Sequence, residues 1–293
     1  MPAAPANVAV IRQVLAGLAD DLAIDAAQCA DMKIAVTEAC TNVVVHAYPG
    51  GQGPLETTMT VLAGSLVVSV RDRGTDFKPT LGLAPKPEAP GDAALGFGLS
   101  LIAALSDEFA IRAGASGTEI QMLFALRGSA TADPSVPATD FATVFTDTSQ
   151  LTRDEPAPPG GIALALSPGV PVAGVLGRLV SLLAARADFS IDRLSDAQLV
   201  SDALATHAPA RTADGLVRVG VTECEGGFDL RVGPLASGGA NALLADTTLP
   251  GVGPLLERLS DEVASEPVRG AGTPAESLRV RLTREPTGGQ LQV

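Results

Sequence analysis

Apolar side chains recur at helical spacing in the segment from Asp31 to Tyr48. They stand three and four positions apart, which is the spacing of an amphipathic helix with one face toward a core. On the polar side, Glu38 and Asn42 are four residues apart and therefore lie one turn above each other. Asn is a poor helix former, and the three valines that follow Asn42 are stiff at χ1. We predict a helix in which Asn42 is present for a reason other than helix propensity.

The rest of the first half has the pattern of a small α+β unit. Alternating apolar residues predict strands, with a hairpin turn at Ala63-Gly64. The loop over residues 75–95 contains four prolines and is long for a compact domain, which is typical of a lid, a binding loop or disorder. The predicted elements are helices over residues 8–20, 26–48 and 96–104, and strands over residues 55–62, 65–71, 109–113 and 119–126.

The second half repeats this order of elements. Both halves contain the tetrapeptide Leu-Ser-Asp-Glu, at 105–108 and at 259–262. We interpret the chain as a tandem repeat of one fold unit, the alternative being two unrelated small α+β domains. A strand over 161–166 precedes the second copy, and FATVF at 141–145 is a candidate for the same role in the first. The predicted counterparts are helices over 174–186 and 194–207, strands over 216–222, 228–232 and 278–283, and a segment over 255–263 that corresponds to 96–109.

The length of 293 residues fits two domains better than one. Residues 128–160 are rich in Thr, Asp and Pro, which is typical of a linker. We therefore expect domains at residues 1–128 and 161–293, joined by a linker at 129–160. Hydrophobic residues make up 46% of the chain but aromatic residues only 3%, so the cores must be aliphatic.

The formal net charge of −13 argues against direct nucleic-acid binding, which requires basic patches, and favours a basic protein partner. The three cysteines, Cys29, Cys40 and Cys224, indicate reduced thiols in a cytoplasmic protein rather than a disulfide framework. No apolar run has the length of a membrane span, and the first residues lack the charged start of a signal peptide. We expect a soluble, cytoplasmic protein without membrane contact.

Four short motifs follow one another in the first half. Each alone is weak, because Gly-x-Gly and Asp-x-Gly are common, but their combination in this order is specific. They are Glu38-x-x-x-Asn42 on a helix, Asp72-x-Gly74 at the end of a strand, Gly96-x-Gly98-Leu99 at the start of a helix, and Gly117-Thr118 before the last strand.

With these motifs the sequence from about Asn7 to Leu126 resembles the Bergerat-fold (GHKL) ATP-binding domains. It is most similar to the anti-sigma-factor serine kinases of the RsbW and SpoIIAB type, whose helix reads much like AVTEACTNVVVHAY. The resemblance implies an α+β fold of two tandem two-layer α/β sandwiches, with a mixed sheet and helices on one face. It also implies ATP and Mg²⁺ as cofactors.

The resemblance further assigns a role to each motif. Asn42 would hold Mg²⁺ by its side-chain oxygen, and Glu38 would be the general base for the attacking hydroxyl. Backbone N–H groups at a helix N-terminus, a favourable position for anions, would contact phosphate. The remaining assignments are Asp72 as acceptor of the adenine amino group, Gly74 at the ring, Gly96, Gly98 and Leu99 at the phosphates, and Gly117 and Thr118 beside the adenine.

Some residues depart from the family pattern or have a simpler explanation. Asp76 stands where the family often has a second Gly after Asp-x-Gly. Glu38 and Asn42 alone would also fit a solvated helix face with an i,i+4 contact. His46 is more typical of a capping or packing residue, and Cys40 of a core thiol.

In the second copy the motif positions differ. Asn42 aligns with His207, Glu38 with Ala203 and Asp72 with Pro234, while only Gly251-x-Gly253 is retained. We predict that this half does not bind ATP and is a degenerate, structural or protein-binding domain. Because single-domain relatives act as homodimers, the two halves could form an internal pseudo-dimer.

The favoured function is an ATP-dependent protein serine/threonine kinase and anti-sigma factor. It would bind a sigma factor and phosphorylate an anti-anti-sigma protein. The alternative is a nucleotide-sensing module that only sequesters its partner, which would need Asn42 and Asp72 but not Glu38. The ATPase part of a sensor histidine kinase is disfavoured because no dimerising helix with a phosphorylatable His precedes Asn7, and gyrase- or chaperone-like members are larger.

Overall fold

The computed structural model describes residues 2–51, 53–62, 64–74, 92–114, 117–126, 161–166, 172–213, 216–249, 253–268 and 274–284. The chain divides into two compact units, one with the described residues up to Leu126 and one with those from Ala163 onward. The loop at 75–91, Asp76, the linker at 129–160, the FATVF segment and Gly251 lie outside the described residues. In the part described, no helix has both the length and the apolar character needed to cross a membrane.

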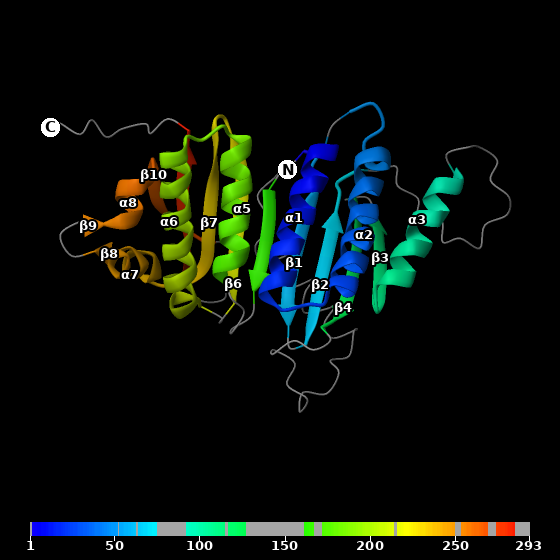
Figure 1. Cartoon of the computed structure of the whole chain (residues 1–293), viewed down its shortest axis with the longest axis horizontal. Coiled ribbons are helices and arrows are strands. Elements are labelled where there is room, and N and C mark those ends of the chain that lie inside the picture. Colours follow the sequence, from blue (N-terminus) through cyan, green and yellow to red (C-terminus); the bar gives the residue numbers. More distant parts are fainter. Residues whose placement is uncertain are drawn as a thin grey trace. The chain divides into compact units, whose positions relative to one another are not determined.

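The first unit is a four-stranded sheet with helices on one face (Figure 1). Its strand order is β1-β2-β4-β3, and all three pairings are antiparallel. The predicted elements are all present. Their bounds are α1 Pro5–Asp21, α2 Ala26–Asn42, the π-helix η1 Val43–Ala47, β1 Glu56–Leu62, β2 Ser65–Arg71, α3 Asp92–Leu105, β3 Glu108–Gly114 and β4 Gly117–Ala125.

The second unit has the same element order with four additions, β5, α7, β8 and β9. Its sheet runs β10-β11-β7-β6-β5, and the described registers are antiparallel. Strands β8 and β9 form a separate two-stranded antiparallel sheet. The elements are β5 Gly161–Leu166, α5 Val172–Arg186, α6 Ile191–His207, the 3₁₀ helix η2 Ala208–Arg211, β6 Val217–Cys224, β7 Gly227–Ala236, α7 Gly239–Asp246, β8 Thr248–Leu249, β9 Gly253–Pro254, α8 Leu255–Leu259, β10 Glu262–Pro267 and β11 Ala275–Thr283.

The segment 255–263, predicted as the counterpart of 96–109, forms α8 up to Leu259 and passes into β10 at Glu262, as the first unit passes from α3 to β3. The Asp261 carboxylate accepts hydrogen bonds from the backbone N–H and the hydroxyl of Thr283. These bonds attach the segment after α8 to the end of β11. One predicted helix bound is wrong. In the first unit α3 begins at Asp92 and not at Gly96. Helix α7 was not predicted.

Both units begin their second helix with a side-chain cap. The Asp25 carboxylate accepts the N–H groups of Ala27 and Gln28 at 3.0 Å, and the Ser190 hydroxyl accepts that of Arg193 at 3.2 Å. Such caps satisfy backbone donors that have no partner inside the helix. Because the two caps start helices of 17 residues each, they give a common reference for comparing α2 with α6.

Corresponding residues of the two units make the same long-range contacts. Gln28 of α2 donates to the carbonyl of Ala125 at 2.6 Å, and Arg193 of α6 donates through Nε to that of Thr283 at 2.8 Å. Each helix is therefore tied to the end of the last strand. Asp107 accepts the N–H of Ala125, just as Asp261 accepts that of Thr283.

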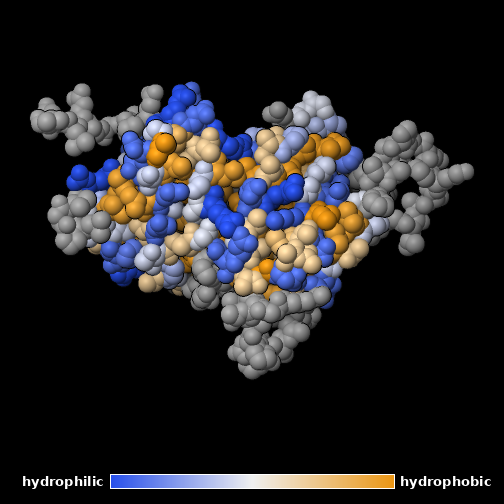
Figure 2. Space-filling model, viewed as in Figure 1, coloured by the Kyte–Doolittle hydropathy of each residue, from blue (hydrophilic) through white to orange (hydrophobic). Residues whose placement is uncertain are grey.

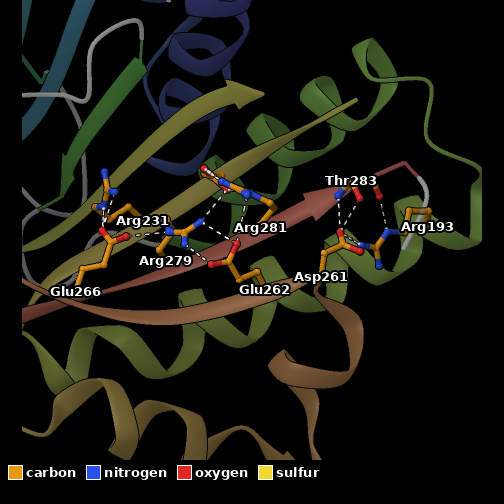
Figure 3. A network of polar contacts seen from close by, with 9 residues as sticks. Arg193, Arg231, Asp261, Glu262, Glu266, Arg279, Arg281 and Thr283 are labelled. Atoms are coloured by element: carbon orange, nitrogen blue, oxygen red, sulfur yellow. Dashed lines mark hydrogen bonds and ion pairs between the residues drawn. The ribbon is translucent and has the colours of Figure 1, made fainter. Parts of the chain in front are cut away.

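The second unit carries more charge in these contacts. Figure 3 shows the guanidinium of Arg193 against Asp261, while three arginines on β7 and β11 form a ladder with acidic side chains of β7 and β10. Arg193 and Asp261 are buried, with side chains 6% and 3% exposed. The ladder pairs are Arg231–Glu266, Arg279–Glu262, Arg279–Glu266, Arg281–Asp229 and Arg281–Glu262.

The buried pair predicts a large stability effect. Replacing Arg193 with Met leaves the Asp261 carboxylate buried without its cation, which destabilises a protein by about 3–5 kcal/mol. Equilibrium urea unfolding would measure the loss in the transition of the second unit. Arg281→Met is the matched control, because its side chain is 38% exposed and surface pairs contribute less than about 1 kcal/mol. Equal effects of the two substitutions would contradict the assignment.

Candidate functional site

A pocket opens at the C-terminal end of α2, where β2 ends and β4 begins. It is a narrow gap that is partly open to solvent and has no room for a separate water molecule. Three of its lining residues are polar residues that the sequence singled out, and the other three are apolar. The lining residues are Asn42, Val43, Val70, Asp72, Thr118 and Ile120. The structure thus brings together side chains that lie up to 76 positions apart in the chain, from Asn42 to Thr118.

Asp72 is held rigidly at the end of β2. Its residue is 2% exposed, and its Oδ1 accepts the backbone N–H groups of Gly74 at 2.8 Å and Thr118 at 3.1 Å. The N–H of Asp72 in turn donates to the carbonyl of Thr118 at 2.9 Å. Burial raises the pKa of the Asp72 carboxyl, while the N–H groups of Gly74 and Thr118 oppose this by stabilising the charged form. The result is a fixed acceptor in a pocket with apolar walls.

Asn42 is the second polar side chain of the pocket. It is 6% exposed, and among the described residues its Nδ2 has no hydrogen-bond partner. A buried N–H donor without a partner is unfavourable by about 1–3 kcal/mol, and Nδ2 can be satisfied by an acceptor such as a phosphate oxygen but not by a cation. Residues 43–47 immediately after it form a π-helix, an irregularity that is frequent at functional sites.

The donor set at Asn42 fits a hard cation that brings its own ligands. An amide oxygen is a suitable ligand for Mg²⁺, which is usually bound by one or two protein groups together with substrate phosphates and water. In the described ranges no group of three or more His, Cys, Asp or Glu side chains could hold a metal by itself. A cation at Asn42 would therefore depend on ligands from outside the chain.

Glu38 and Gly98 lie next to Asn42. A Cβ atom at Gly98 would be 3.1 Å from Oε2 of Glu38 and 3.6 Å from Oδ1 of Asn42. Helix α3 therefore comes close to these two polar side chains of α2 at Gly98. The absence of a side chain at Gly98 leaves Glu38 and Asn42 uncrowded.

The Gly-x-Gly motif stands at a different position in α3 from the one predicted. Because α3 begins at Asp92, both Gly96 and Gly98 stand inside the helix and not at its N-terminus. Residues 93–95 are Ala, Ala and Leu, which are strong helix formers and extend the helix toward its start. Leu99 is fully buried. The phosphate contacts assigned to Gly96, Gly98 and Leu99 stay predictions.

Gly74 and Gly117 are required by the backbone itself. A Cβ at Gly74 would stand 2.0 Å from the carbonyl oxygen of Ala47, and one at Gly117 would stand 2.0 Å from that of Asp72. Gly117 also has φ of +116°, which side-chain-bearing residues rarely adopt. Both glycines therefore allow the strand ends and η1 to approach Asp72.

Tyr48 is a site residue that the sequence analysis missed. Its hydroxyl donates to the carbonyl of Pro54 at 2.6 Å and accepts the N–H of Arg73 at 2.8 Å. Burial raises the pKa of this phenol, so it stays protonated and keeps both bonds. Arg73 also pairs with Glu56 at 2.7 Å. The one available signal was that Tyr48 is the only tyrosine of the chain and directly follows η1.

Cys40 was interpreted as a core thiol, and the structure agrees. The residue has no exposed surface, and burial raises its pKa to about 12. A thiol with this pKa is protonated at neutral pH and chemically inert. It contributes packing to α2 and no chemistry.

Comparison with known proteins gives the family. The histidine kinase-like ATPase domain matches residues 1–124. The serine-protein kinase RsbW of Bacillus licheniformis is 36% identical over 128 residues, which are 41% of this chain and 79% of that protein. The chain belongs to the family of RsbW-type kinases. The same kinase of Bacillus thuringiensis (strain Al Hakam) is 38% identical over 77 residues, which cover 26% of this chain and 48% of that protein.

Solved structures are less similar to this chain than its sequence relatives are. The histidine kinase domain of a blue-light activated histidine kinase from Erythrobacter litoralis EL346 gives a TM-score of 0.28 at 20% identity. The superposition covers 34% of this chain and 45% of that one. A score this low supports no further statement, and the assignment depends on the sequence relatives.

The corresponding corner of the second unit has different contents. When β7 is aligned with β2, Pro234 takes the place of Asp72. When β11 is aligned with β4, Glu276 takes the place of Thr118. The Glu276 carboxylate accepts the backbone N–H of Ala240 in α7 at 3.1 Å and the Ser265 hydroxyl at 2.7 Å. These bonds, with the Ser265 hydroxyl first, hold the pKa of Glu276 below its usual value.

Helix α7 is fixed at both ends. Its N-terminus binds Glu276, and Asp246 at its last turn pairs with Arg211 of η2 at 2.6 Å. Its apolar residues Ala240 and Leu243 are fully buried. In chain order α7 occupies the segment between β7 and α8, which corresponds to the segment between β2 and α3 of the first unit.

The geometry at Gly117 predicts that alanine is not tolerated there. Gly117→Ala forces a Cβ onto the Asp72 carbonyl at a positive φ, which we expect to destabilise the first unit by about 1–3 kcal/mol or more. Thermal melting would measure the loss. Gly114→Ala is the control on the same hairpin, because nothing lies within 4 Å of its Cβ position, and its effect should stay within about 0.5 kcal/mol. A similar melting temperature for both variants would show that the close approach is absent.

Proposed function

We propose that the first unit binds ATP with Mg²⁺ and transfers the terminal phosphoryl group to a Ser or Thr hydroxyl of a protein partner. The observation that carries this proposal is the pocket that joins the fixed Asp72 carboxyl to the unpartnered amide of Asn42. Membership in the RsbW-type family supports the same activity.

Each residue has a task that its surroundings fit. Asp72 accepts the adenine amino group while Val70 and Ile120 flank the ring. Asn42 holds the cation by its amide oxygen. When bound, Mg²⁺ neutralises phosphate charge. Glu38 takes the proton of the attacking hydroxyl as the new oxygen–phosphorus bond forms and the bond to ADP breaks.

We further propose that the partners are a sigma factor, which the chain sequesters, and an anti-anti-sigma protein, which it phosphorylates. This rests on the similarity to RsbW and on the net charge of −13, which suits a basic protein surface better than nucleic acid. The free cysteines Cys29, Cys40 and Cys224 suit a reducing, cytoplasmic environment.

Two substitutions separate binding from turnover. In Asp72→Asn the amide oxygen can still accept the two N–H groups, but its NH₂ opposes the adenine amino group, so ATP affinity should fall at least about tenfold. Glu38→Gln should bind ATP normally and lose phosphoryl transfer by about 10²–10⁴-fold. Calorimetric titration with Mg-ATP and transfer of ³²P from labelled ATP are the two measurements.

Asp25→Asn is the matched control for the first variant, because Asn caps a helix as well as Asp does and Asp25 lies outside the pocket. Unchanged affinity of Asp72→Asn would remove the adenine assignment. The alternative function, a nucleotide-sensing module that only sequesters its partner, predicts ATP binding with no transfer even in the wild type.

We also propose that the second unit is a degenerate copy of the first that does not bind nucleotide. The matching strand orders and the paired contacts of Gln28 and Arg193 support a common origin. Pro234 lacks the carboxylate of Asp72, and in chain order α7 lies between β7 and α8, where the first unit has the segment between β2 and α3. That the two copies form an internal pseudo-dimer stays a prediction.

The degenerate copy predicts one ATP site per chain. Hydrogen exchange should find the amides of α7 protected and unchanged by Mg-ATP, since their protection comes from internal contacts to Glu276 and Arg211. The amides around Asp72 and Thr118 should slow on ATP addition. A stoichiometry of two, or slowing of exchange in α7 by ATP, would refute the proposal.

A further inference from the structure

The turn that carries Asp72 has all three of its backbone N–H groups bound. The N–H of Asp72 donates to the carbonyl of Thr118 at 2.9 Å, and that of Gly74 donates to the Asp72 carboxylate at 2.8 Å. The N–H of Arg73, between them, donates to the hydroxyl of Tyr48 at 2.8 Å. Two of these bonds are made within the strand ends, and the third joins the turn to the residue that follows η1.

The end of η1 lies directly against this turn. A Cβ atom at Gly74 would be 2.0 Å from the carbonyl oxygen of Ala47, so the two backbones touch. Tyr48 follows Ala47 immediately, and its hydroxyl accepts the N–H of Arg73. The residue before η1 is Asn42, whose side chain lines the pocket. One short helical segment thus has the pocket amide at its start and the turn at its end.

The Tyr48 side chain is also bound to residues 53–54. Its hydroxyl donates to the carbonyl of Pro54 at 2.6 Å, and a Cβ atom at Gly53 would stand 2.0 Å from Cε1 of the ring. The carbonyl of Gly53 accepts the N–H of Ala3 at 2.8 Å, and Pro2 forms an isolated bridge with Pro54. The acceptor of the hydroxyl proton therefore belongs to a paired backbone segment, which gives Tyr48 a fixed support.

A phenol suits this position because one oxygen can donate and accept at the same time. Burial raises the pKa of Tyr48, so the proton that it donates to Pro54 stays in place at neutral pH. Residues 48–54, which connect η1 with β1, contain no charged residue, and Figure 2 shows a pale surface over the described part of this connection, at the top of the first unit. Phe at position 48 would keep the ring contacts and lose both hydrogen bonds.

We propose that Tyr48 is a positioning residue for adenine, which holds the turn of residues 72–74 against η1 and so directs the Asp72 carboxyl toward the adenine amino group. This proposal rests on the nucleotide-binding function above, in which Asp72 accepts that amino group. Tyr48 does not line the pocket, so its effect reaches the nucleotide through the turn. Without the hydroxyl, the N–H of Arg73 loses its acceptor, and the turn keeps only the bonds within the strand ends.

A positioning role of this kind can be recognised by its effect on ligand selectivity. The triphosphate of purine riboside is ATP without the amino group on its base, so it cannot donate to Asp72. A site that accepts a hydrogen bond discriminates against the analogue that lacks the donor, because the buried polar group is then left unpaired. A displaced turn lowers the affinity for ATP alone, whereas general damage to the first unit lowers the affinity for both nucleotides.

The test is calorimetric titration of the full-length protein with ATP and with this analogue, each with Mg²⁺. We expect the wild type to bind ATP at least about tenfold more tightly than the analogue. Tyr48→Phe should bind ATP about fivefold or more weakly than the wild type, while its affinity for the analogue stays within about twofold. The retained binding of the analogue also verifies that the variant is folded.

Ser106→Ala is the matched control. It removes a hydroxyl of the first unit that donates to the carbonyl of Ile102 at 2.7 Å, outside the pocket, and it should bind both nucleotides as the wild type does. A second background tests the route through Asp72. Because Asp72→Asn already removes the acceptor, adding Tyr48→Phe to it should change the affinity for ATP by less than about twofold, whereas independent effects would add.

The outcomes separate this role from the function on which it rests. Unchanged ATP affinity in Tyr48→Phe, equal losses for ATP and the analogue, or additive effects in the double variant would each overturn the positioning role and leave the kinase function intact. Equal affinity of the wild type for ATP and the analogue would overturn the adenine contact of Asp72 and this role with it. A wild type that binds neither nucleotide would overturn the proposed function as well.

Discussion

The carboxyl group of Asp72 accepts two backbone N–H groups, one from Gly74 in its own segment and one from Thr118 at the start of β4. These bonds join the end of one strand to the beginning of another that is 46 residues away. Gly117 lets the two backbones meet, because any side chain there would strike the Asp72 carbonyl. The walls of the pocket and the direction of the carboxyl are thus fixed by one local arrangement. The chain tolerates a buried acid because backbone donors compensate for part of its lost hydration.

The second unit shows what the same sheet becomes without this acid. With Pro234 inside β7 at the position of Asp72, there is no carboxylate to receive backbone donors, and Glu276 on the neighbouring strand receives the N–H of Ala240 instead. A carboxylate at the N-terminus of a helix is stabilised by the helix dipole, so Glu276 favours a helix in that segment. The acidic contact therefore serves internal packing in the second unit, while in the first it forms part of an open pocket.

The sequence predicted the elements better than their ends. Periodicity was sufficient for α1, α2 and the paired strands β1 and β2, because their apolar residues face one core. The start of α3 was misplaced because glycine was taken as the boundary, although the preceding alanines favour helix. Helix α7, with eight residues, gives too short a pattern to be read.

The same division holds for the site. The motifs selected Asn42, Asp72 and Thr118, which line one pocket, because each stands at or next to the end of a recognisable element. The motifs did not select Tyr48, because its role depends on hydrogen bonds to the backbone of Pro54 and Arg73.

Glu38 lies on α2 between a buried polar side chain, Asn42, and an exposed apolar one, Ile34. Toward the pocket, α2 buries Asn42 with an unsatisfied amide, which lowers the stability of the protein without ligand. Toward solvent, it exposes Ile34 and Val45, which gain nothing from packing in the isolated chain. A helix under selection for stability alone would remove both features. Both features lie within two turns of Glu38, and the unpaired N–H donor of Asn42 is consistent with the phosphate-bearing ligand proposed for this unit.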